Sequence, residues 1–117
     1  MEKCRVLIIA EDTIFSNAIE LLLILQENLE ITGAVPPDIE VIAAQIEKTR
    51  PNVIIINDDI ATANAQLIVS LLKTYSHLRI ITFNLDNNRI NVYDNRQVDV
   101  TTVSDLVSAI TEIHDQT

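Results

Sequence analysis

The feature that most constrains the fold is the regular alternation of short β-branched runs with longer segments of helical period. Residues 5–10 and 53–56 are almost continuously apolar, which is typical of strands buried on both faces of a sheet. Helical segments follow both runs, so the pattern predicts a parallel sheet covered by helices. The length of 117 residues suits a single domain, residues 1–117, with a real hydrophobic core.

The expected elements follow one another along the chain without linkers or repeats. Strands are predicted at residues 5–10, 30–35, 53–56 and 79–83, with helices at 15–26, 39–49 and 64–75. Asp38 is suited to cap the second of these helices by accepting backbone N–H bonds, and Pro51 ends it.

No segment of helical period directly follows the strand predicted at residues 79–83. Residues 89–93 and 96–100 instead alternate around a turn at Asp94 and Asn95, which predicts a β-hairpin over residues 89–100. A last helix is predicted after Thr102 from the spacing of five apolar residues, which are Val103, Leu106, Val107, Ile110 and Ile113.

Composition excludes several classes of function. Gly33 is the one glycine, which argues against a glycine-rich phosphate-binding loop. The net charge of -9 makes nucleic acid and an anionic membrane surface poor partners. The single cysteine, Cys4, cannot form an internal disulfide, and the apolar run at 19–25 is too short to span a bilayer. We therefore expect a cytoplasmic protein that binds no nucleic acid and no membrane.

The first predicted helix is more apolar than one buried face requires. We expect its inward stripe to consist of Ile14, Ala18, Leu21, Leu22 and Leu25. Ile19, Leu23 and Ile24 are then left over. Such surplus apolar surface on a small protein indicates an interface, and the alternative is a helix with a wide buried face.

The order and spacing of four stretches resemble the receiver domains of bacterial two-component response regulators, nearest the LuxR/NarL-type branch. They are VLIIAED at 6–12, GAV at 33–35, RPNVIII at 50–56 and DLVSAI at 105–110. The resemblance covers nearly the whole chain. It implies a flavodoxin-like (CheY-like) α/β fold, an open parallel five-stranded sheet with helices on both faces, in which the hairpin replaces the fourth helix.

The same resemblance implies a degenerate phosphorylation site. In the family an acidic pair holds Mg²⁺, and Glu11 and Asp12 match that pair. Asn57 stands at the place of the phosphoacceptor aspartate, Asn84 at that of a Thr or Ser, and Asp99, or failing that Val98, at that of a Lys. A neutral amide is not a usable nucleophile, so the resemblance implies a pseudo-receiver that is not an enzyme and needs no cofactor, with Mg²⁺ as the one candidate.

Two other functions stay open. The nucleophile could have slipped by one residue to Asp58 or Asp59, although the more ordinary role of these residues is in a loop or at a helix N-terminus. Glu11 and Asp12 have a similar structural alternative as a solvated loop. The second open function is a small flavodoxin-like module that binds a ligand at the carboxyl ends of the strands.

The resemblance also implies partners. Receivers of this branch pair through their first and last helices, which implies a homodimer through Ile19, Leu23, Ile24, Val107 and Ile110. It further implies an unidentified protein partner and a DNA-binding domain C-terminal to these residues. His77 and His114 are expected at the surface, and Cys4 is expected to be a packed residue.

Overall fold

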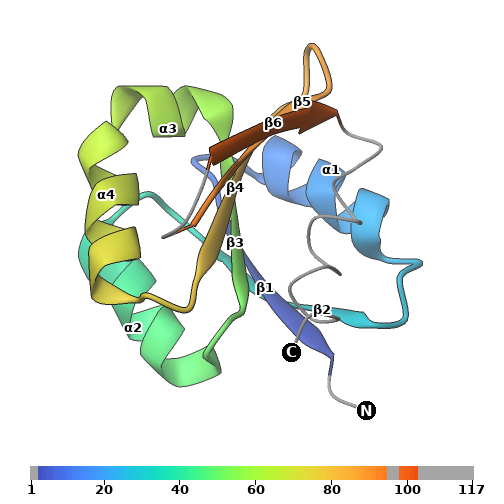
Figure 1. The fold of residues 1–117 in the computed structure, drawn as a ribbon. Coiled ribbons are helices and arrows are strands. Elements are labelled where there is room, and N and C mark those ends of the chain that lie inside the picture. Colours follow the sequence, from blue (N-terminus) through green and yellow to red (C-terminus); the bar gives the residue numbers. More distant parts are fainter. Residues whose placement is uncertain (1–2, 95–97, 103–117) are drawn as a thin grey trace.

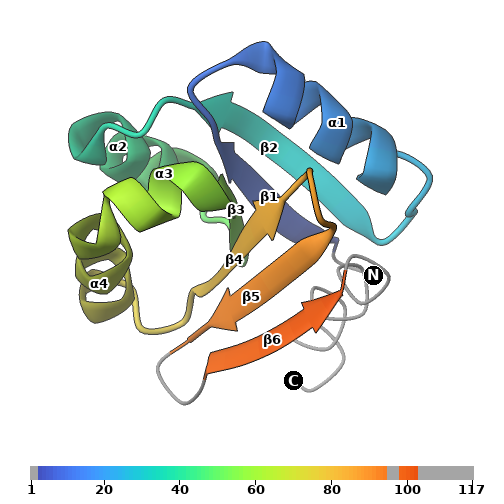
Figure 2. The same cartoon turned by 90° about the horizontal axis from the view of Figure 1, so that it is seen from above.

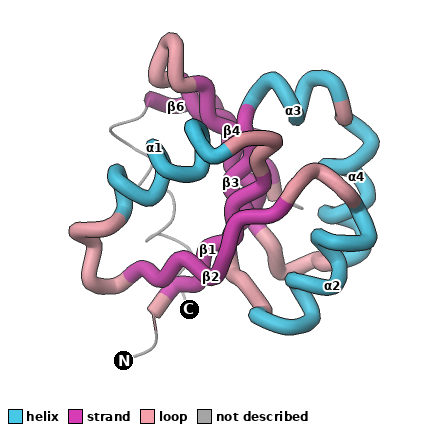
Figure 3. Tube along the Cα trace, turned by 180° about the vertical axis from the view of Figure 1, so that it is seen from behind, coloured by secondary structure: helices cyan, strands magenta, loops and turns pink. Residues whose placement is uncertain are grey.

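The computed structural model describes residues 3–94 and 98–102, and Figure 1 shows their arrangement around one central sheet. Within them the sheet has six strands, which are β1 (Cys4–Ile9), β2 (Leu29–Val35), β3 (Val53–Asn57), β4 (Arg79–Asn84), β5 (Arg89–Tyr93) and β6 (Val98–Thr102). Four helices are described, namely α1 (Thr13–Leu23), α2 (Ile39–Thr49), α3 (Asp58–Ala63) and α4 (Ala65–Thr74). Figures 1 and 3 show α1 on one face of the sheet and α2, α3 and α4 on the other.

The strand order is β2-β1-β3-β4-β5-β6, and its first four strands are parallel. This confirms the α/β class and the strands expected between residues 5 and 83. The sheet differs from the expected five parallel strands, because β5 and β6 are both paired antiparallel to their neighbours. Figure 2 shows this pair extending the sheet beyond β4.

The reversal after β4 has a local cause. Only residues 85–88 connect β4 to β5, and a parallel connection needs a crossover of a dozen or more residues. Asparagines build the turn: the Asn84 Oδ1 atom accepts from the Asp86 N–H at 2.8 Å, and the Asn87 Oδ1 atom accepts from the Arg89 N–H at 2.9 Å. Asn88 adopts a φ of 58°, a left-handed conformation that asparagine tolerates better than most residues.

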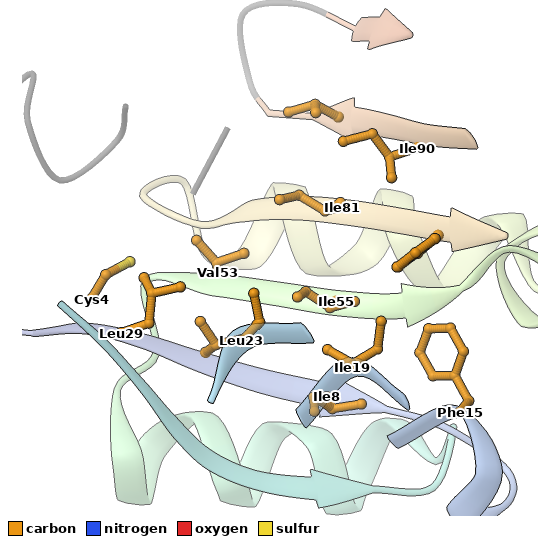
Figure 4. Close-up of a cluster of buried hydrophobic side chains, with 13 residues drawn as sticks. Cys4, Ile8, Phe15, Ile19, Leu23, Leu29, Val53, Ile55, Ile81 and Ile90 are labelled. Carbon is orange, nitrogen blue, oxygen red and sulfur yellow. The ribbon is translucent and has the colours of Figure 1, made fainter. Parts of the chain in front are cut away.

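Two hydrophobic layers fill the space on either side of the sheet. The layer under α1 joins alternate residues of five strands to Phe15, Ile19 and Leu23, as Figure 4 shows. The opposite layer joins the other strand positions to α2, α3 and α4, and includes Ile42 and Leu71. Both faces of β1 and β3 are therefore buried, as their continuous apolar runs predict.

The expected orientation of α1 is wrong. Ile19 and Leu23, which we assigned to an interface, are 0% and 2% exposed and belong to the core. Ile14 and Leu25, which we assigned to the core, are 73% and 86% exposed. The helix carries two opposed apolar stripes, and Phe15 belongs to the stripe that faces inward, where its ring contacts Phe83 edge-on at a centroid distance of 6.3 Å.

Smaller differences concern the ends of elements. The helix α1 begins at Thr13 and ends at Leu23, earlier than the expected residues 15–26, and β6 begins two residues later than the second hairpin strand was expected. The short helix α3 was not predicted. The expected last helix, with Val107, Ile110 and His114, lies outside the described residues.

The two stripes of α1 can be distinguished by a pair of variants. Phe15→Ala should lower the free energy of unfolding by about 3–5 kcal/mol, because it leaves a cavity under the sheet. Its neighbour Ile14 is exposed, so Ile14→Ala should change that free energy by only about 0.5 kcal/mol. Urea unfolding followed by circular dichroism measures both values, and a larger loss for Ile14→Ala would contradict the observed orientation.

Candidate functional site

Parallel pairing brings the carboxyl ends of β1, β3 and β4 to one edge of the sheet. Ile9 pairs with Ile56, and Asn57 pairs with Phe83, the residue before Asn84. The loops that carry the predicted site residues therefore leave the sheet at the same edge, which is the place where open α/β sheets bind ligands.

Asp12 has a structural role at this edge. It is the N-cap of α1, and its Oδ1 atom accepts from the backbone N–H groups of Ile14 at 3.1 Å and Phe15 at 3.2 Å. These are two of the N–H groups that a helix start leaves without an intrahelical acceptor. Glu11, beside it, is exposed.

Asn57 has the same role one strand away. It closes β3 and caps α3, with its Oδ1 atom accepting from the Asp59 N–H at 3.0 Å. Asp58 and Asp59 form the first turn of that helix, where carboxylates interact favourably with the helix dipole. Both aspartates therefore lie at a helix N-terminus, and phosphorylation of Asp58 or Asp59 stays a prediction.

Asn84 shapes the backbone after its strand in the same way as Asp12 and Asn57. Asp12, Asn57 and Asn84 each accept a hydrogen bond from the backbone N–H two residues further along the chain. Asp38 does the same after β2, with the Glu40 N–H at 2.9 Å, which confirms its predicted capping role. Asn57 and Asn84 are the last residues of β3 and β4, and Asp12 and Asp38 follow β1 and β2 by three residues, so a polar side chain shapes the backbone after each of the first four strands.

Asp99 does not join the other predicted residues. It lies in β6 opposite Val92, which itself pairs with Ile81 in the middle of β4. The strand position at the edge beside Asn84 is taken by Arg89, whose side chain is exposed. Sequence reasoning missed this cation because the register of β5 depends on the turn at 85–88.

Glu11 and Asp12 are the two residues expected from the sequence to bind Mg²⁺. Among the described residues no group of three or more His, Cys, Asp or Glu side chains is arranged to hold a metal ion. One Asp12 oxygen accepts the two capping hydrogen bonds. Mg²⁺ binding by Glu11 and Asp12 stays a prediction.

The lone cysteine is a core residue. Cys4 is fully buried at the start of β1, and burial raises the pKa of its thiol, while the nearby positive charge of Arg5 acts in the opposite direction. A buried thiol with a raised pKa is a poor nucleophile. His77 is exposed, as expected.

The geometry defines a receiver-like α/β fold with an amide at the end of its central strand. No protein-family model and no curated protein matches this sequence. A solved structure that is similar to the chain is that of the RcsB response regulator from Salmonella typhimurium, described for its conformational dynamism in DNA interaction. The TM-score is 0.62 at 21% sequence identity.

The similarity covers 75% of this chain and 46% of the RcsB chain, so this chain spans less than half of that regulator. It establishes that the two share a fold. Within the described part of this chain, no helix combines the length and apolar character needed to cross a membrane.

The capping role of Asn57 can be tested by substitution. Asn57→Ala removes the acceptor for the Asp59 N–H and should lower the free energy of unfolding by about 0.5–2 kcal/mol. Asn57→Asp keeps a side-chain oxygen in that place and should be close to the wild type. Chemical denaturation of the three proteins measures the difference, and an equal loss in both variants would argue against the cap.

Proposed function

We propose that this chain is an atypical receiver-like signalling domain, a pseudo-receiver, that acts through protein contacts without phosphorylation and is not an enzyme. The observation that carries the proposal is Asn57, an amide at the end of the central strand of a receiver-like sheet, with its oxygen used as a helix cap. An amide cannot attack a phosphoryl donor as a carboxylate does.

Two features of the edge support this proposal. Asn84 has no hydroxyl group to offer a transferred phosphoryl group, and its oxygen builds the turn into β5. That turn leads directly into the antiparallel strand β5, which supports the proposal that the β5–β6 hairpin replaces the fourth helix of a receiver. We infer that the output surface of this domain differs from that of ordinary receivers, and we place the protein in the cytoplasm.

The outer face of α1 supports the proposed homodimer. Ile14 and Leu21 lie on the side of α1 opposite the buried stripe, Leu25 lies in the turn after the helix, and all three are largely exposed. Ile24, one of the residues assigned to an interface from the sequence, is exposed as well. A contiguous apolar face of this kind is typical of an interaction site. We propose that two copies pair through this face, together with the last helix.

Phosphorylation is tested by intact-mass spectrometry after incubation with acetyl phosphate and Mg²⁺. We expect no added phosphoryl mass on the wild-type protein, because Asn57 supplies no nucleophile. The control is Asp58→Asn. An adduct on the wild type that disappears in this variant would show that Asp58 is the acceptor and would overturn the proposal.

Dimerisation is tested by light scattering after size-exclusion chromatography. The wild type should have twice the mass of the chain, and the double variant Leu21→Arg, Leu25→Arg should be monomeric, because a two-fold interface places like charges near each other. Val41→Arg is the control on the exposed side of α2. A monomeric wild type, or a dimeric double variant, would refute pairing through α1.

A further inference from the structure

A groove lies on the opposite side of the sheet from α1, between two helices and the hairpin. Its volume is about 340 Å³. The groove is lined by Ile68, Val69 and Leu72 of α4, Ala61 of α3 and Tyr93 of β5. The lining is therefore mainly apolar.

The groove exists because this part of the sheet has no covering helix among the described residues. The two faces of β5 differ in burial: Ile90 and Val92, on the α1 face, are buried, whereas Asn91 and Tyr93, on the α4 face, are only half-buried. Figure 2 shows β5 and β6 extending away from α4 on this side. The connection from β4 to β5 is a turn, so it supplies no helix to cover them.

The groove also contains one carboxylate. Asp58, in the first turn of α3, is half-buried and lines the groove. Among the described residues its side chain has no hydrogen-bonding or ion-pair partner. A carboxylate beside an apolar surface attracts a cation more strongly than one in open water does, because its surroundings are less polarisable.

We propose that this groove binds an amphipathic α-helix of a partner protein, with the apolar face of the helix on α4 and Tyr93 and a Lys or Arg near Asp58. The inference rests on the proposed action through protein contacts and names the surface that makes one of them. A helix is favoured because helices cover the sheet faces of α/β folds and insert their apolar faces into hydrophobic grooves.

Tyr93 is the β5 residue that lines the groove, and a partner helix that continues along β5 has a length that can be calculated. The five residues of β5 extend about 17 Å at roughly 3.4 Å per residue, which corresponds to about 11 residues of helix at 1.5 Å each. The negative net charge of the chain also favours a basic partner, because opposite charges attract.

The probe is a fluorescein-labelled, hydrocarbon-stapled peptide of about 14 residues, with Leu at helical spacing on one face and two Lys residues beside that face. A matched peptide carries Glu in place of both Lys residues. Fluorescence anisotropy should show saturable binding of the Lys peptide to the full chain and weaker binding of the Glu peptide. Absence of saturable binding by the Lys peptide would overturn the proposal.

Variants locate the binding site. Val69→Asp should weaken binding of the Lys peptide by about tenfold or more, because it places an unpaired charge in the interface. Val41→Asp is the matched control, since Val41 is 39% exposed on α2 outside the groove and Val69 is 42% exposed. Ala65→Asp, at a second exposed groove position, should act like Val69→Asp. Equal effects of Val69→Asp and Val41→Asp would exclude the groove.

Further variants test the role of the Asp58 carboxylate in peptide binding and separate peptide binding from dimerisation. Asp58→Asn should weaken binding of the Lys peptide by about three- to tenfold. It should also reduce the difference in affinity between the Lys peptide and the Glu peptide. Val69→Asp should leave the mass of the dimer unchanged, and the double variant Leu21→Arg, Leu25→Arg should keep its affinity for the peptide. A monomeric wild type, or a dimeric double variant, together with intact peptide binding would thus refute only pairing through α1. Absence of peptide binding together with the expected change from dimer to monomer would refute only the groove.

Discussion

The burial of β1 and β3 on both faces is the constraint on which the rest of the structure depends. Val6 to Ile9 and Val53 to Ile56 are at most 1% exposed, so helices have to cover both sides of these strands. Crossover helices keep the strands parallel, and parallel strands bring their carboxyl ends together at one edge. The position of the candidate site is therefore a consequence of how the two central strands are buried.

At that edge, polar residues shape loops. Asp12, Asn57 and Asn84 hold the backbone that follows β1, β3 and β4, and each uses a side-chain oxygen for this purpose. An amide performs this role as well as a carboxylate does, because a cap needs an acceptor and no negative charge. An amide at residue 57 is thus compatible with the fold, and the proposed action without phosphorylation depends on it.

The turn after β4 has the largest effect on the surfaces of the domain. By directing the chain into an antiparallel strand, residues 85–88 enlarge the sheet without adding a helix to the α4 face. The half-buried Asn91 and Tyr93 and the groove beside α4 follow from that connection. Together with the exposed stripe of α1, they give the domain two apolar surfaces on opposite sides of the sheet.

The sequence by itself determined the parallel α/β class, the strands from residue 5 to residue 83, the cap at Asp38 and the amide at residue 57, because these depend on local patterns of burial and chain reversal. It also predicted that β-structure follows β4. Only the tertiary structure decided which stripe of α1 faces the core, since both stripes have helical spacing and the contact of Phe15 with Phe83 distinguishes them. The register that places Arg89 beside Asn84 and keeps Asp99 away from the edge was likewise decided by pairing between strands, which no single segment encodes.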